Sequence, residues 1–125
     1  MKIIHKGINF EDVRGTITDI FVQNPQDHAT IIFSKKGAVR GNHYHKETVQ
    51  SDFVVSGKLK VLTQKVGETE ITETEVGPND FISHEASEAH TYVALEDSIF
   101  ISFNAGPRGG ENYENDTFRL EVPLA

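Results

Sequence analysis

The 125-residue chain contains no cysteine and no tryptophan. Without cysteine there is no disulfide framework, no thiolate zinc site, no iron–sulfur cluster and no cysteine nucleophile. No apolar run approaches the roughly 18 residues that a membrane span needs, and the N-terminal stretch lacks the apolar core of a signal peptide. We therefore expect a single domain, residues 1–125, that is cytoplasmic and has no membrane partner.

Basic side chains are few. The chain has 12 Lys and Arg against 19 Asp and Glu, which gives a formal net charge of −7. Binding to a nucleic acid polymer depends on clustered Lys and Arg, so no such partner is expected. The same balance sets a condition on any anionic small molecule: its site must be locally basic, because the field of the whole protein repels it.

Long helical patterns are missing as well. Short apolar runs rich in β-branched and aromatic residues alternate with Gly, Pro and Asn turn signals, which predicts an all-β sandwich or barrel. In the run Thr69–Glu75, threonine or isoleucine alternates with glutamate, which favours an edge strand with one charged face. The predicted strands are Thr16–Val22, Ala29–Ser34, Ala38–His45, Ser51–Ser56, Lys58–Gln64, Thr69–Val76, Asp80–Ser83, His90–Leu95, Ser98–Asn104 and Thr117–Val122.

One segment carries candidate chemistry. His43 and His45 are two residues apart in a predicted strand, so both side chains lie on one face and Tyr44 lies on the other. Two neighbouring imidazoles suit a metal ion or a proton-transfer pair. His90 begins a later strand with Tyr92 on its face, and in a closed barrel it converges with the first pair. The other histidines, His5, His28 and His84, are interpreted as structural.

These residues resemble the cupin superfamily. The spacing Gly37, five residues, His43-x-His45, four residues, Gln50, six residues, Gly57 matches the first cupin motif, with glutamine where the family has glutamate. The second motif, which ends at His90, is similar but lacks the family's Pro and Gly. The resemblance covers about residues 37–103. It implies a double-stranded β-helix: a cupin jelly-roll barrel of two antiparallel sheets with the site in its mouth.

The string from Arg40 to Gln50 also resembles sugar-nucleotide cupins. Arg40-Gly-Asn-His43 is similar to the Arg-Gly-x-His motif of dTDP-4-dehydrorhamnose 3,5-epimerases, in which the histidine is the base and the arginine contacts substrate. The full string resembles dTDP-4-keto-6-deoxyhexose 3,4-ketoisomerases, in which both histidines transfer protons without a metal. It also resembles the cupin domains of capsular-polysaccharide epimerases and reductases, in which the site holds zinc.

The resemblance leaves two chemistries open. One is a divalent ion (Zn, Ni, Fe or Mn) held by His43, His45, His90 and Gln50 as a weak fourth ligand, with no organic cofactor. The other is proton transfer without a metal. In that case a neutral imidazole with a pKa near 6.5 takes the acidified proton beside a ketone, and a nearby donor stabilises the enolate.

The expected function is an isomerase: a metal-binding epimerase or ketoisomerase acting on a 4-keto-deoxysugar nucleotide in polysaccharide biosynthesis. The candidate catalytic residues are His43, His45 and Tyr92, and the candidate substrate-binding residues are Arg40 and Arg108. The alternatives are a metal-dependent cupin oxygenase and a non-catalytic sugar-binding or regulatory cupin. Cupins of this size usually form homodimers, often by exchanging an N-terminal strand, and the open edges of a barrel half are a physical reason to pair.

Overall fold

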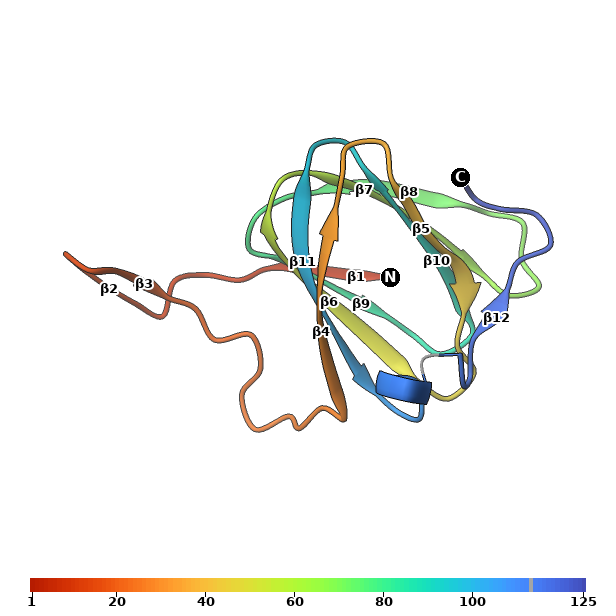
Figure 1. Ribbon diagram of the computed structural model, residues 1–125, viewed down its shortest axis with the longest axis horizontal. Helices are drawn as coiled ribbons and strands as arrows, with labels where there is room; N and C mark the ends of the chain where they lie inside the picture. Colours follow the sequence, from red (N-terminus) through yellow and green to blue (C-terminus); the bar gives the residue numbers. More distant parts are fainter. Residues whose placement is uncertain (113) are drawn as a thin grey trace.

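The computed structural model describes residues 1–112 and 114–125, and within them the chain is all-β (Figure 1). The first sheet has the order β1-β9-β6-β11-β4 and the second the order β12-β5-β10-β7-β8, with every pairing antiparallel. The first sheet contains β1 (Lys2–His5), β9 (Asp80–His84), β6 (Val49–Ser56), β11 (Ser98–Ala105) and β4 (His28–Ser34). The second contains β12 (Phe118–Arg119), β5 (Val39–Tyr44), β10 (Glu88–Ala94), β7 (Leu59–Lys65) and β8 (Thr72–Val76).

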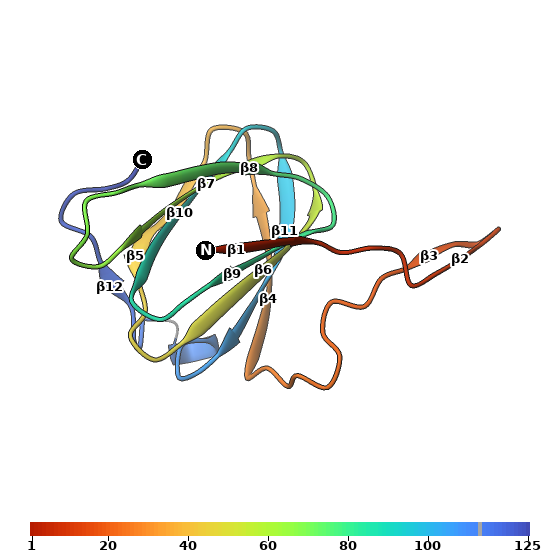
Figure 2. The ribbon, with the colours of Figure 1, turned by 180° about the vertical axis from the view of Figure 1, so that it is seen from behind.

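The two sheets enclose a barrel interior. Side chains alternate between its inside and outside along each strand. The hydrophobic core joins Val54, Ile82 and Phe100 of the first sheet to apolar residues of the second, among them Leu59 and Val61. The expected jelly roll of two antiparallel sheets is therefore confirmed. The view from behind shows β8 at one edge of the second sheet, as the alternating threonine and glutamate pattern predicted (Figure 2).

The N-terminal region differs from the prediction. Thr16–Val22 is not one strand: only Gly15–Ile17 (β3) is extended, paired with Phe10–Asp12 (β2) in a hairpin that stands away from the barrel (Figure 1). The chain then turns, and the ring of Phe21 packs edge-on against two phenylalanines of the first sheet. Burial of that ring outside the sheet outweighs the strand propensity of the run.

The C-terminal region also departs from its expected strand. Of Thr117–Val122, only Phe118–Arg119 pairs with β5. Beyond Arg119, the backbone is held by hydrogen bonds to Asn42. The backbone carbonyl of Asn42 accepts from Leu120 N–H, and its side-chain oxygen accepts from Leu124 N–H. A 3-10 turn, Gly110–Asn112, precedes this segment. No helix in the described part of the chain is long and apolar enough to cross a membrane.

Two glycines of the motif are required by close backbone approach. Gly41 has φ +102°, and a Cβ there would lie 2.6 Å from the carbonyl oxygen of His90. Gly57 has φ +87°, and a Cβ there would collide with Asp97 and Ser98. Glycine tolerates both the positive φ and the contact. Gly41 therefore lets β5 approach β10 at the position where the histidines meet.

Candidate functional site

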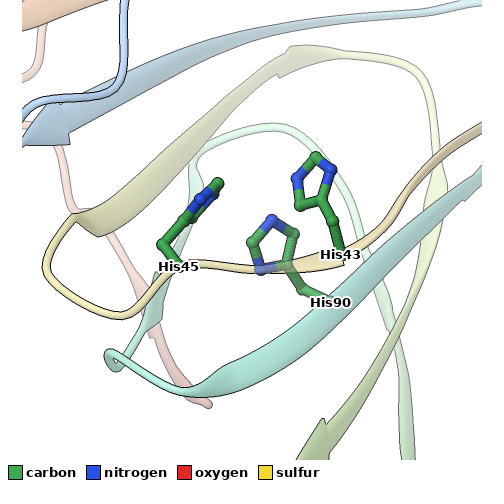
Figure 3. Close-up of side chains that lie close together, drawn as sticks. All are labelled: His43, His45 and His90. Atoms are coloured by element: carbon green, nitrogen blue, oxygen red, sulfur yellow. The ribbon is translucent and has the colours of Figure 1, made fainter. Parts of the chain in front are cut away.

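Three histidines converge inside the barrel at one end. His43 on β5 is paired in register with His90 on β10, and His45 follows β5 by one residue. Their ring centroids lie 4.8–5.3 Å apart, and their ligand atoms all lie within 4.8 Å of one another. Figure 3 shows the three rings gathered in one space from two neighbouring strands. The convergence expected from the spacing is thus present, and Tyr44 faces away to stack on Phe118.

All three imidazoles are held neutral. Burial lowers the pKa of His43 from 6.5 to about 3, with further lowering by His45, Arg108 and Arg119. Burial also lowers the pKa of His45, despite its hydrogen bonds to Asp116 and Gln50, and lowers that of His90 far more strongly. Neutral imidazoles keep a free lone pair, which is what metal ligation or general-base chemistry requires.

The hydrogen bonds of His45 define a position for a cation. Its Nδ1 donates to the carbonyl of Asp116 at 2.8 Å, so the neutral ring carries a bare lone pair on Nε2. That Nε2 faces Oε1 of Gln50 at 3.1 Å, and the amide cannot rotate without turning its oxygen towards Asp52, to which its nitrogen donates at 3.0 and 3.2 Å. In the neutral ring two lone pairs thus face each other, and a proton on Nε2 or a metal ion bound by both atoms satisfies them.

Further buried nitrogens lack partners. Within the described residues, Nδ1 of His43 and both ring nitrogens of His90 have no hydrogen-bond partner of good geometry. Buried polar atoms are normally paired. Imidazole nitrogens and an amide oxygen are also donors that zinc and related ions accept. The donor set therefore fits a divalent ion between His43, His45, His90 and Gln50, as the cupin resemblance implied.

The histidines open onto a cavity of about 680 Å³. His43, His90 and Gln50 line it together with three cations, Arg40, Arg108 and Arg119. Arg108 is half-buried and its Nε has no hydrogen-bond partner among the described residues. Glu114 also lines the cavity, but three guanidinium groups against this carboxylate leave the pocket locally basic, as an anionic ligand needs.

The two predicted substrate-binding arginines, Arg40 and Arg108, differ in how firmly hydrogen bonds hold their side chains. Arg40 borders the cavity but is tied to the first sheet, where Nε donates to Ser34 Oγ at 2.9 Å and Nη2 to the Phe33 carbonyl at 3.1 Å. Arg108 is the less restrained of the two. Arg119, which the sequence did not single out, lines the same cavity and pairs with Glu114 at 2.6 Å. Arg119 lies opposite His43 on the short strand β12, within the predicted strand Thr117–Val122, but the sequence did not indicate that this strand borders the site.

Tyr92, the predicted catalytic tyrosine, has its hydroxyl engaged away from the cavity. It donates to Asp52 at 2.5 Å and accepts from His84 Nε2 at 2.8 Å. Burial raises the pKa of Tyr92 well above its ordinary value. Its ring lines the cavity, but its O–H is fully used in positioning its neighbours.

Sequence reasoning missed a buried network beside the site. His84 was interpreted as structural, yet its ring stacks on His90 with centroids 4.5 Å apart and its Nδ1 lies 3.3 Å from the carboxylate of Glu88. Burial opposes protonation of His84, but Asp52 and Glu88 outweigh it and raise its pKa. Asp52 lies within a predicted strand, whereas His84 directly follows one and Glu88 lies two residues before another, so no local pattern marked the three as a buried group.

The polar C-terminal loop closes one side of the site. The carboxylate of Asp116 accepts from the backbone N–H groups of Lys46, Glu47 and Thr48 at 2.6–2.8 Å. These bonds outweigh partial burial and lower the pKa of Asp116. The loop thereby holds the turn after His45 and brings Arg108 to the cavity, so the Gly106–Asp116 segment, in its described part, folds over the pocket mouth.

Residues 10–98 match the family described as the polysaccharide biosynthesis C-terminal domain. The chain belongs to this family. No curated protein matches it in sequence. The capsular polysaccharide assembling protein CapF from Staphylococcus aureus is 27% identical, with a TM-score of 0.69 over 94% of this chain and 33% of CapF. The chain thus spans about a third of the length of CapF.

Two smaller structures share the fold over most of their length. A dTDP-4-dehydrorhamnose 3,5-epimerase from Sulfolobus tokodaii is 25% identical, with a TM-score of 0.71 over 82% of this chain and 68% of that one. The 3,4-ketoisomerase QdtA from Thermoanaerobacterium thermosaccharolyticum, solved in complex with TDP, has a TM-score of 0.78 over 96% and 88% of the two chains. At 16% identity QdtA shows the fold alone. The family and the cupin fold expected from the motif are thus confirmed.

Proposed function

We propose that this chain is an isomerase of the sugar-nucleotide cupin type, an epimerase or ketoisomerase acting on a 4-keto-deoxysugar nucleotide. The observation that carries the proposal is the cavity itself: neutral, unpartnered imidazoles and three arginines face one space. The name of the similar structure from Sulfolobus tokodaii, a dTDP-4-dehydrorhamnose 3,5-epimerase, supports the same substrate class.

The proposed ion position lies where Nε2 of His45 and Oε1 of Gln50 face each other, with His90 as the third donor. When bound there, a divalent ion supplies a Lewis acid that polarises a ketone oxygen. His45 is already oriented for this role, because its Nδ1–H bond to Asp116 fixes the ring and the tautomer.

We assign His43, the remaining donor of the set, to proton transfer and not to the ion; it lines the cavity. Its neutral imidazole takes the proton from the carbon beside the ketone, and the electron pair moves onto the ketone oxygen as an enolate. For epimerisation, a proton from solvent adds to the opposite face of the enolate, and His43 releases its own proton to water. For ketoisomerisation, His43 returns its proton to the former ketone carbon, while the proton of the neighbouring hydroxyl passes to the former ketone oxygen. His43 ends either cycle neutral.

The arginines of the cavity affect both the binding of a diphosphate and the pKa of His43. Arg108 and Arg119 both help to lower the pKa of His43. A diphosphate seated between these cations would offset their part of the lowering, whereas burial, the largest cause, remains. The basic pocket is thus proposed to bind the nucleotide end beside the base that acts on the sugar end.

The test is incubation of the purified chain with dTDP-4-keto-6-deoxyglucose in D2O. We expect deuterium at the carbon beside the ketone and an epimerised or ketoisomerised product, with about one Zn, Ni, Fe or Mn ion per chain. Binding of the nucleotide sugar without exchange or product would overturn the enzyme proposal in favour of a sugar-binding cupin. Substrate oxidation that depends on iron and dioxygen would overturn it in favour of an oxygenase.

We also propose a homodimer through the outer face of the first sheet. In-register pairing aligns an apolar row across all five strands, which comprises Ile4, Phe81, Phe53, Ile101 and Ile31. Phe21 covers only part of this face, and Ile31 and Phe33 are 56% and 63% exposed.

The hairpin of β2 and β3 favours a second copy as the occupant. It projects away from the barrel with Phe10 and Ile17 exposed (Figures 1 and 2). An isolated two-stranded hairpin is marginal in water, so it gains stability by packing on the same kind of apolar face in a partner.

Analytical ultracentrifugation tests this surface. The wild type should sediment as a dimer and Phe33→Glu as a monomer, whereas the exposed Val122→Glu, which lies outside the sheets, should remain a dimer. A monomeric wild type, or a dimeric Phe33→Glu variant, would contradict the proposed interface.

A further inference from the structure

Gln50 occupies a position where the cupin motif has a carboxylate, and the structure places a different carboxylate directly behind it. Asp52 is two residues further along β6, so its side chain points into the barrel on the same face. It is completely buried, and both of its oxygens accept from Nε2 of Gln50, at 3.2 and 3.0 Å. The amide thus lies between a buried anion and the three histidines.

This contact fixes which way the amide points. The nitrogen of Gln50 must face Asp52, because reversing the amide would set its oxygen against the carboxylate. The oxygen therefore faces Nε2 of His45, at 3.1 Å. The interaction also polarises the amide, since a hydrogen bond to an ionised acceptor is stronger than a neutral one.

Among the described residues, the charge of Asp52 has no counter-ion closer than His84. Its other contacts are the hydroxyl of Tyr92 at 2.5 Å and the more distant His84 Nε2 at 3.6 Å. His84 in turn faces Glu88 at 3.3 Å, so its charge is shared between two carboxylates. The N-terminal amine also contacts Glu88 and not Asp52. The carboxylate of Asp52 is therefore less closely paired than that of Glu88, and its partial charge lies next to the Gln50 amide that faces His45.

We propose that Gln50 and Asp52 together replace the ligand carboxylate of the cupin motif: Gln50 supplies the oxygen that faces the ion, and Asp52 orients that oxygen and supplies the compensating charge. Asp52 is a positioning residue, since it acts through Gln50. The inference rests on the proposed metal site but not on the proposed isomerase activity.

The test measures metal affinity directly, with Zn²⁺ competed against a chromophoric chelator and Co²⁺ followed by its absorption spectrum. Asp52→Asn keeps an oxygen that can accept from Gln50 but removes the charge. We expect it to weaken Zn²⁺ binding by about 10–100-fold, the usual cost of losing an outer partner of a ligand. Glu88→Gln is the matched control: it removes a charge from the same buried network, but Glu88 does not contact Gln50. It should weaken Zn²⁺ binding less.

A double variant that moves the carboxylate from position 52 to position 50 completes the experiment. Gln50→Glu combined with Asp52→Asn moves the carboxylate to the ligand position and keeps the total charge, so it should restore Zn²⁺ affinity to the wild-type range. If Asp52→Asn alone does not fold, the Zn²⁺ affinity of the double variant still tests the inference. Absence of binding by the folded double variant overturns the inference.

The remaining outcomes separate this inference from the proposals it builds on. Wild-type affinity in folded Asp52→Asn, or an equal loss in Glu88→Gln, overturns the role of Asp52 while the metal site stands. A wild type that binds no ion overturns both. Turnover by metal-free protein leaves the isomerase proposal standing in either case.

Discussion

The two ends of the barrel interior differ sharply, although the same strands build both. The inward positions of β10 run from Glu88 and His90 through Tyr92 to Ala94. Those of β6 run from Gln50 through Asp52 to Val54 in the same way. One end is thus a conventional apolar core, and the other is filled with buried polar groups.

The energetic consequences of the two ends are opposite. The apolar end gains from every buried methylene, at about 25 cal/mol per Å². The polar end must hydrogen-bond each buried group to avoid a desolvation penalty. Within residues 1–112 and 114–125, it leaves nitrogens of His43 and His90 without partners. A folded chain that keeps such groups is organised for a ligand. The apolar end therefore provides the stability that lets the polar end remain incompletely satisfied.

The strongest test of this division is His43→Gln at the polar end. Removal of a general base usually costs about 10²–10⁴-fold in rate. We expect that loss in kcat with dTDP-4-keto-6-deoxyglucose, with the metal content and the thermal unfolding temperature maintained. The control is His5→Gln, an exposed histidine that bonds Asp80 outside the barrel. Loss of the metal from His43→Gln would instead make His43 a ligand, and unchanged turnover would remove it from the mechanism.

The second test is Leu59→Ala at the apolar end, where the side chain is 1% exposed. Truncation of a buried leucine costs about 2–5 kcal/mol. We expect urea unfolding to show a loss of that size, whereas kcat of the folded variant stays near that of wild type. A large fall in kcat with no loss of stability would show that the two ends are not separable.

The third test uses pH on the metal-free protein. The pKa of His43 falls from its ordinary 6.5 to about 3 on folding, so between these values the unfolded chain binds more protons than the folded one. Stability is then fully present above pH 6.5 and is lost as the pH falls. His45 and His90 act in the same direction, whereas His84 acts in the opposite one.

From pH 6.5 to 5, His43 alone should cost up to about 2 kcal/mol, since one pKa unit corresponds to about 1.36 kcal/mol. Urea unfolding at both pH values measures the change. His43→Gln should flatten this dependence, and an identical slope in the variant would contradict the assignment.

The sequence predicted the two ends unequally. Strand alternation and turn residues located most of the barrel, and the spacing of His43, His45 and His90 located the site, because strand periodicity sets which side chains share a face. The N-terminal hairpin was missed, since Phe21 packs outside the sheet in a contact distant in sequence.

The buried network was less predictable for a physical reason. Asp52, His84 and Glu88 belong to three different strands, and each is polar in an unremarkable sequence context. Only register brings them together, as Gln50 pairs with His84 between β6 and β9. Arg119 lies within the predicted strand Thr117–Val122, but only the pairing of that strand with β5, which its sequence pattern does not specify, brings Arg119 to the site.

The smallest expected effect lies outside both ends, on the edge strand β8. Glu73 and Glu75 pair with Lys60 and Lys58 of β7 at 3.7 and 3.0 Å, and all four side chains are substantially exposed. Exposed ion pairs contribute about 0–1 kcal/mol, so Glu75→Gln should change urea unfolding by less than about 1 kcal/mol and leave kcat and Zn²⁺ affinity unaltered. A larger loss of stability, or any change in kcat or Zn²⁺ affinity, would mean that the edge strand β8 affects the barrel interior. The division of the interior into a stabilising apolar end and a ligand-binding polar end would then not account for its properties.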